Sequence, residues 1–147
     1  MVHKIVSPLI GVVFVQMFFF VTSVSAFSPD DLARLNLTKS CPYCNLSYAR
    51  LAEADLSDAN LKGAALDHAT LAEADLTHAD LSETTLSEAN LENANLMDAN
   101  LANAHLSGAN FSGANLFHAT LTNANLSGTV WIDGKKCKKG SIGKCDQ

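Results

Sequence analysis

An apolar residue stands at every fifth position of this chain, seventeen times in succession from Leu46 to Leu126. Sixteen of these residues are Leu and one is Phe111, and Ala stands two positions earlier in fifteen of the seventeen units. On an α-helix, residues five apart are rotated by about 140°, so these side chains would spread around the helix and form no buried stripe. A period of five therefore argues against a helix and predicts a stack of short extended segments that turn at each fifth residue.

Four such units would close a roughly square coil of about twenty residues, with Ala and Leu inside and polar side chains outside. The backbone of each coil could then pair with the coils above and below it at about 4.8 Å. The repeats amount to about four and a third coils, which predicts a rod roughly 21 Å long with a dry leucine core.

The individual repeats resemble those of a known family. The runs ADLSD at residues 54–58 and ANFSG at residues 109–113 are similar to the units of pentapeptide-repeat proteins, and the resemblance covers residues 44–131. It implies an all-β fold, a right-handed quadrilateral parallel β-helix. Cys44 and Thr84 depart from the pattern because they stand where the other units have Ala. Members of this family differ in function, so the resemblance implies no single activity.

The N-terminal segment predicts export from the cytoplasm. Residues 1–26 are typical of a secretory signal peptide, with His3 and Lys4 before an apolar core at 9–21 and small residues up to Ala26. We expect the repeats to reach an extracytoplasmic space, either the periplasm or, in a phototroph, the thylakoid lumen.

An alternative is an uncleaved membrane anchor formed by residues 5–26, since that stretch is uncharged and long enough to span a bilayer. In either case the expected organisation is an N-terminal cap at 27–43, the β-helix at 44–131, and a C-terminal cap with a basic tail at 132–147.

Both ends of the rod carry residues suited to covering it, as an open solenoid end requires. Ser28 followed by Pro29 and two aspartates is a helix-start signal, which predicts a short helix lying as a lid on the first coil. At the other end, Trp131 and Ile132 are expected to cover the last coil before the polar tail.

The four cysteines form two pairs in the sequence, Cys41 with Cys44 and Cys137 with Cys145. An even number in an exported protein favours disulfides, and the length of the coils restricts pairing to within each end. The same separation argues against a four-cysteine zinc site. The letters CPYC at residues 41–44 also resemble the glutaredoxin active-site motif, so thiol–disulfide chemistry is an alternative, although the surrounding fold differs.

Stacking the sequence in steps of twenty places polar side chains in columns along the rod. One column alternates carboxylates and imidazoles at about 4.8 Å spacing. Such a column could respond to pH or weakly bind a divalent metal ion, although exposed polar residues are also common without a role. Its members are Asp58, His78, Asp98 and His118.

A second column places Met97 below Phe117 at outward positions, which marks a candidate contact patch.

Charge is distributed unevenly along the rod. Residues 45–98 hold eleven carboxylates against two basic residues, a net charge of −9, with Asp55 stacked below Asp75. Residues 99–132 contain no Asp, Glu, Lys or Arg, and residues 133–147 carry +3. Contact between acidic and basic ends makes self-association conceivable, and salt would weaken it.

The family includes DNA mimics that protect gyrase, so DNA mimicry is a further alternative, against which two observations argue. The acidic part spans about 13 Å, which imitates only about four base pairs, and gyrase is cytoplasmic. Nucleic-acid binding is not expected either, since the basic tail has no aromatic residue to stack on bases.

The sequence therefore predicts a non-catalytic exported solenoid that offers an interaction or structural surface to an unknown protein partner. No phosphate loop, nucleophile motif or metal-ligand spacing indicates an enzyme, and no cofactor is expected. Membrane contact is expected only if the N-terminal segment remains uncleaved.

Overall fold

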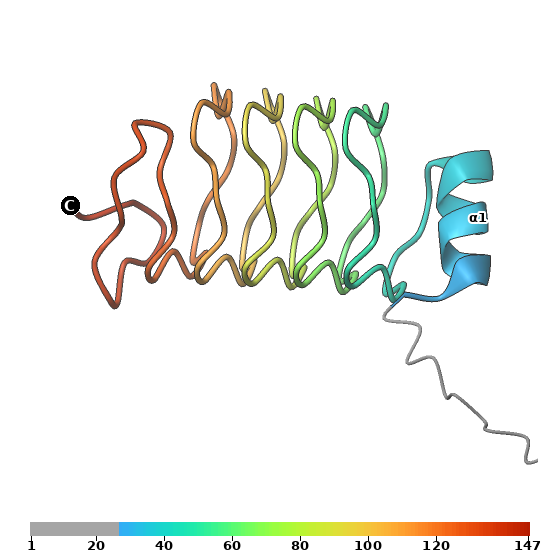
Figure 1. Ribbon diagram of the computed structural model, residues 1–147, viewed down its shortest axis with the longest axis horizontal. Coiled ribbons are helices and arrows are strands. Elements are labelled where there is room, and N and C mark those ends of the chain that lie inside the picture. Colours follow the sequence, from blue (N-terminus) through green and yellow to red (C-terminus); the bar gives the residue numbers. More distant parts are fainter. Residues whose placement is uncertain (1–26) are drawn as a thin grey trace, which may run out of the picture.

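The computed structural model of the protein describes residues 27–147, which form a short helix followed by a rod of stacked coils (Figure 1). The helix α1 (Pro29–Thr38) lies across one end of the rod, and the chain winds away from it toward the C-terminus. The signal segment or anchor predicted within residues 1–26 lies outside the described residues. Within residues 27–147, no helix is both long and apolar enough to cross a membrane.

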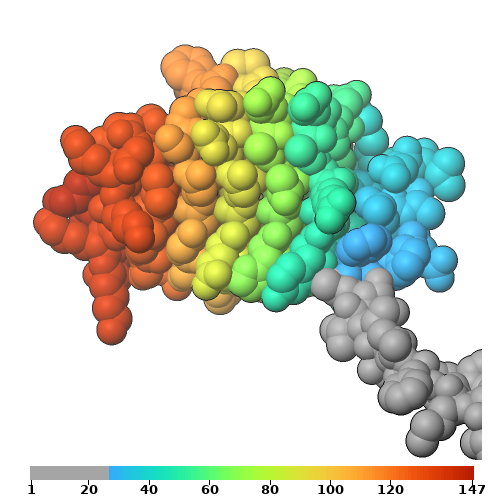
Figure 2. Space-filling model, in the orientation of Figure 1, coloured from blue at the N-terminus to red at the C-terminus, as the bar shows by residue number. Residues whose placement is uncertain are grey.

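Parallel backbone bridges between residues twenty positions apart hold the coils together. The bridging residue is the one before each inward Leu, and the ladder runs without a break from Ser40–Asn60 to Asn110–Val130. Figure 2 shows the result on the surface, where successive coils form bands across the rod. This pairing confirms the twenty-residue coil predicted from the period.

Each five-residue unit contains a tight turn rather than a single corner residue. The carbonyl of the inward Leu accepts a hydrogen bond from the N–H of the Ala three residues later, as between Leu56 and Ala59 at 3.1 Å. The second residue between them has a positive φ, which is 58° at Asp58. The sequence predicted a longer extended side with one corner residue. Only one residue per unit bridges in the ladder because two others are used by the turn.

The core is the dry leucine column that the sequence predicts. The inward leucines from Leu46 to Leu106 are at most 4% exposed, and Phe111 takes the same position with no exposed surface. Thr84, which replaces Ala, is fully buried, and its hydroxyl donates to the carbonyl of Leu81 at 2.7 Å. The polar substitution is tolerated because its one donor has a partner.

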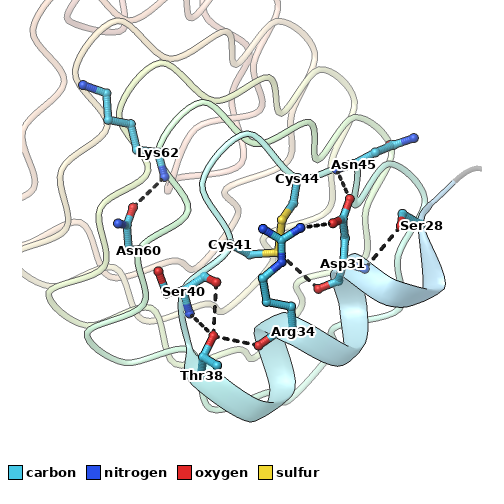
Figure 3. Close-up of a disulfide and its surroundings, with 10 residues drawn as sticks. All are labelled: Ser28, Asp31, Arg34, Thr38, Ser40, Cys41, Cys44, Asn45, Asn60 and Lys62. Atoms are coloured by element: carbon cyan, nitrogen blue, oxygen red, sulfur yellow. Dashed lines mark hydrogen bonds and ion pairs between the residues drawn. A yellow bond between two sulfur atoms is a disulfide. The ribbon is translucent and has the colours of Figure 1, made fainter.

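Helix α1 confirms the predicted N-terminal helix and closes the first coil. Ser28 is its N-cap, with the hydroxyl oxygen accepting from the N–H of Asp31 at 3.2 Å. Leu35 is buried against the core and Leu32 is partly buried there. The Asp31 carboxylate accepts from the N–H of Asn45 at 3.0 Å, which ties the helix to the coil beneath it (Figure 3).

At the C-terminal end, the prediction that Trp131 and Ile132 cover the last coil is correct only for Trp131. The Trp131 ring is partly buried, with its centroid 6.2 Å from that of Phe111. Ile132 is 43% exposed. Trp131 continues the inward five-residue period from Leu126, whereas Ile132 falls on the following, outward position.

The remaining cover comes from the tail. Lys136 pairs antiparallel with Val130, and Ile142 pairs antiparallel with Asn125. Ser141 is also buried, at 1% exposure. The segment that the sequence indicated as a polar tail therefore folds back along two sides of the last coil.

Candidate functional site

The cysteines are paired within each end of the rod, Cys41 with Cys44 and Cys137 with Cys145. Both sulfur atoms of the N-terminal pair lie beside helix α1, next to Asp31 (Figure 3). Within residues 27–147 these two sulfurs and the Asp31 carboxylate form the one group of three candidate metal ligands within 4.8 Å of one another. Disulfide sulfurs are not thiolates, so this group offers a metal one strong ligand while the bond is intact.

Three of the four residues in the predicted carboxylate–imidazole column are brought together around Asp98. His118 Nδ1 lies 3.4 Å from Asp98 Oδ1, and His78 Nδ1 lies 4.0 Å from Asp98 Oδ2. Among the described residues no ion pair joins Asp58 to His78. The column is therefore a cluster of two imidazoles around one carboxylate rather than a continuous ladder of four groups.

The backbone gives one reason for the residue types in this column. All four residues have φ between 58° and 60°, the left-handed region in which Asn, Asp and His are enriched among residues other than Gly. The twenty-residue period predicts the column but not this backbone requirement. The signal that could have revealed it is the presence of Gly, Asn, Asp or His at many equivalent positions of the other units.

A second imidazole–carboxylate pair, which the sequence analysis missed, lies on another corner. His68 Nδ1 is 3.5 Å from Glu88 Oε2, and the ring of Tyr48 stacks on the His68 ring with 4.6 Å between centroids. Stacking in steps of twenty would have found this group, because the three residues are twenty positions apart.

The like charges of Asp55 and Asp75 are stabilised by hydrogen bonds. Lys39 Nζ donates to Asp55 Oδ1 at 2.9 Å, and with the hydroxyl and N–H of Ser57 it lowers the Asp55 pKa to about 2. The hydroxyl and N–H of Thr77 lower the pKa of Asp75, against the opposing effect of Asp55. The repulsion between the two stacked carboxylates is thus offset by local donors and one cation.

The two residues of the candidate contact patch, Met97 and Phe117, differ in their exposure to solvent. Phe117 is 62% exposed, whereas Met97 in the coil below is partly buried. The Phe117 ring stacks on His118 with 3.9 Å between centroids. The apolar surface at this corner is therefore chiefly that of Phe117, in the last coil.

Phe117 belongs to a part of the last coil whose backbone edge is open. In inner coils, the N–H groups of the inward Leu and of the residue two positions later donate to the next coil, as Leu76 does to Asn95 at 2.7 Å. Within residues 27–147 no hydrogen-bond acceptor is present for the backbone N–H groups of Leu116, His118, Leu121 and Asn123. The tail covers only the other two sides of this coil, and Leu116 and Leu121 are correspondingly half-buried.

Comparison with known proteins identifies the family. A family model described as pentapeptide repeats matches eight copies, at residues 43–71, 54–93 and 94–130. The chain belongs to the pentapeptide-repeat family. Its relatives form a right-handed β-helix solenoid, which agrees with the solenoid predicted from the repeats. A search of curated protein sequences finds no significant match.

Solved pentapeptide-repeat structures agree with this assignment. HetL, involved in heterocyst differentiation regulation in Nostoc sp. strain PCC 7120, is 40% identical with a TM-score of 0.61, over 62% of this chain and 42% of HetL. A thylakoid-lumen protein of Arabidopsis thaliana is 30% identical with a TM-score of 0.50, over 67% of this chain and 78% of its own.

The fluoroquinolone resistance protein QnrB1 is 27% identical with a TM-score of 0.51, over 54% of this chain and 42% of QnrB1. This pentapeptide-repeat chain therefore spans less than half the length of HetL and of QnrB1.

Proposed function

We propose that this protein is a non-catalytic, exported pentapeptide-repeat rod of about four coils that binds another protein through its C-terminal end. The observation that carries the proposal is the open edge of the last coil. There, four backbone N–H groups lack protein acceptors within residues 27–147, and two of them flank the exposed Phe117. An unpaired edge with adjacent apolar surface is a ready site for pairing with another chain.

The composition of the interior supports a binding role rather than a catalytic one. The inward positions are filled almost entirely by Ala and Leu, so the carboxylates, imidazoles and amines of the repeats lie on the outside of the rod. Pentapeptide-repeat relatives are generally structural or interaction proteins. A binding surface is therefore the function that the arrangement of this chain favours.

The proposed compartment is the periplasm or, in a phototroph, the thylakoid lumen. Three features support it: the signal-like composition of residues 1–26, two cysteine pairs at bonding distance, and a thylakoid-lumen relative. The proposal includes both disulfides as covalent locks on the two ends of the rod.

Two other functions have weaker support. Thiol–disulfide exchange through Cys41 and Cys44 is disfavoured because both residues are at most 3% exposed and lie beside an acidic side chain. DNA mimicry has the acidic half of the rod and the likeness to QnrB1 in its favour, but export removes the chain from gyrase. The reduction potential of the cysteine pair and a gyrase supercoiling assay would test these alternatives.

The decisive experiment is affinity capture from the native extracytoplasmic fraction, with the exported chain tagged before Phe27 so that the C-terminal end stays free. Phe117→Ser tests the proposed surface, and Leu37→Ser is the matched control because Leu37 is an 84% exposed apolar residue at the opposite end. We expect the same partner with the wild type and Leu37→Ser, and its loss with Phe117→Ser. Equal capture by all three chains would refute the proposed surface.

Light scattering on the same three proteins tests self-association. If the partner is a second copy of the chain, the mass of the wild type and Leu37→Ser should exceed that of Phe117→Ser.

A further inference from the structure

We propose that the partner at the C-terminal end is a second copy of this chain, an inference that rests on the proposed function because it uses the same open edge. The last coil has four sides, each with one bridging residue. The sides at Asn115 and Thr120 form the open half, on which no further backbone of residues 27–147 pairs. The sides at Asn125 and Val130 form the covered half, which carries the returning tail. Two such ends fit together about a two-fold axis, with the covered half of each copy on the open half of the other.

The open half lacks hydrogen-bond donors as well as acceptors. In inner coils, the carbonyl of each inward Ala accepts from an N–H of the next coil. Within residues 27–147 no donor is present for the corresponding carbonyls of Ala114 and Ala119. The first open side therefore presents the carbonyl of Ala114 and the N–H of Leu116, and the second presents those of Ala119 and Leu121.

The tail presents the complementary groups at Lys136 and Ile142. The N–H of Trp131 donates to the residue before Lys136 at 2.7 Å, and the carbonyl of Thr129 accepts from the residue after it at 2.8 Å. In an antiparallel bridge of this kind, the N–H and C=O of the central residue point toward the opposite edge. Within residues 27–147 these two groups have no hydrogen-bond partner at Lys136 or at Ile142, and both side chains are exposed.

The direction of the tail completes the match. The tail runs antiparallel to the covered half beneath it. A two-fold axis along the boundary between the halves makes the covered half of the second copy antiparallel to the open half of the first. The tail of the second copy is then parallel to the open half, as successive coils are to each other. Its Lys136 pairs with Asn115 and its Ile142 with Thr120, each donating to the open carbonyl and accepting from the open N–H.

Charge and apolar surface are consistent with this arrangement. Each basic tail lies on the other copy's section at 99–132, which contains no Asp, Glu, Lys or Arg. The exposed ring of Phe117 lies at the corner between the two open sides, and the symmetry places it against residues 137–141 of the second copy. The two tails carry like charge, so salt should not weaken this pairing, whereas it would weaken contact between the acidic and basic ends.

The sharpest test is disulfide cross-linking between two singly substituted, oxidised chains tagged before Phe27. All four native cysteines are paired, so each introduced thiol is the one that is free. Bridged residues lie about 4.8 Å apart, which a disulfide can span. We expect Thr120→Cys mixed with Ile142→Cys to form a covalent dimer on mild oxidation. Thr120→Cys mixed with Lys136→Cys is the matched control and should not, because these two residues lie on different sides.

Light scattering and amide exchange give readouts that need no added thiol. We expect the wild type and Leu37→Ser to have twice the mass of one chain at low and at high salt, and Phe117→Ser to be closer to one chain. The amides of Leu116 and Leu121 should exchange several-fold more slowly at high protein concentration, where the dimer forms, and that of Leu86 should not change.

Failure of this inference is distinguishable from failure of the proposed function. A single-chain mass of the wild type at every concentration, or equal cross-linking of Thr120→Cys to Ile142→Cys and to Lys136→Cys, would overturn the pairing with a second copy. The proposed function would still stand if Phe117→Ser abolished the capture of a different protein. If the second copy is the partner, the tagged chain should capture the untagged chain.

Discussion

At the scale of single residues, the left-handed corner of each unit is the strongest local constraint. Among residues 27–147, fifteen residues other than Gly have positive φ, and all but one of them stand in the repeating turn. Asn, Asp and His adopt this conformation at little cost, whereas Glu lacks a short polar side chain that can hydrogen-bond to the local backbone. The repeat therefore carries strain at its Glu corners that its Asn corners avoid.

Glu73 provides a direct measure of this strain. It has φ of 59° and an exposed side chain. We expect Glu73→Asn to be more stable than Glu73→Gln by about 0.5–1 kcal/mol, because both remove the charge and only Asn favours the left-handed backbone. Urea unfolding of the two variants gives the difference. Equal free energies of unfolding would show that the corner imposes no such preference.

The Lys39–Asp55 contact predicts a pH dependence. The folded-state pKa of Asp55, about 2, lies below its ordinary value of 3.8. The resulting stabilisation is therefore complete above about pH 4 and is lost as the pH falls toward 2. In Lys39→Met, we expect the Asp55 pKa, followed by carbon NMR of the carboxyl group, to rise toward its ordinary value.

Asp75 is the internal control for this titration. Its pKa is lowered chiefly by the hydroxyl and N–H of Thr77, so it should remain low in Lys39→Met. An unchanged Asp55 midpoint in this variant would contradict the role given to the ammonium group.

At the scale of elements, the two ends of the rod are covered in different ways. Helix α1 covers the first coil through the apolar side chains of Leu32 and Leu35 and the contacts of Asp31 and Ser28 with Asn45. The C-terminal tail covers only two sides of the last coil, by antiparallel backbone pairing. The N-terminal end is thus closed and the C-terminal end half open, which places the proposed binding surface at the latter.

Leu35 tests the contribution of the helix to stability. It is 1% exposed, so Leu35→Ala should lower the free energy of unfolding by about 2–5 kcal/mol through the lost burial and the cavity left behind. Leu37→Ala, on the exposed face of the same helix, should change it by less than about 0.5 kcal/mol. Chemical denaturation measures both free energies of unfolding. Similar losses of stability in the two variants would argue against specific packing of Leu35 on the first coil.

At the scale of the whole molecule, stability should vary along the rod, because each coil contacts only its neighbours. Inner coils are paired on both sides, whereas the last coil has an open edge. We expect amide hydrogen exchange to be slowest at Leu76, Leu86 and Leu96 and fastest among the inward leucines at Leu116 and Leu121. Uniform protection along the rod would indicate a single cooperative unit instead.

The charge of the molecule changes along the same axis. The acidic half of the rod lies near the closed end, and the uncharged section and the basic tail lie at the open end. A partner that pairs with the open edge would therefore approach neutral or positive surface and avoid the −9 section. This polarity gives the rod two chemically distinct ends, although its core is the same throughout.

The sequence by itself determined the coil, the inward Ala and Leu positions, and which residues stack twenty positions apart. It could do so because a strict period leaves one register in which every apolar side chain is buried. Counting in steps of twenty residues placed Asp98 between His78 and His118, and the same count pairs His68 with Glu88.

Only the tertiary structure decided the rest. The left-handed corners, the reach of Lys39 to Asp55, the antiparallel return of the tail and the open edge at Leu116 all involve turn geometry or segments outside the period. A repeating pattern specifies contacts between repeats, but the ends of a solenoid are closed by non-repeating segments. Their contacts arise from packing against the finished stack rather than from any period in the chain.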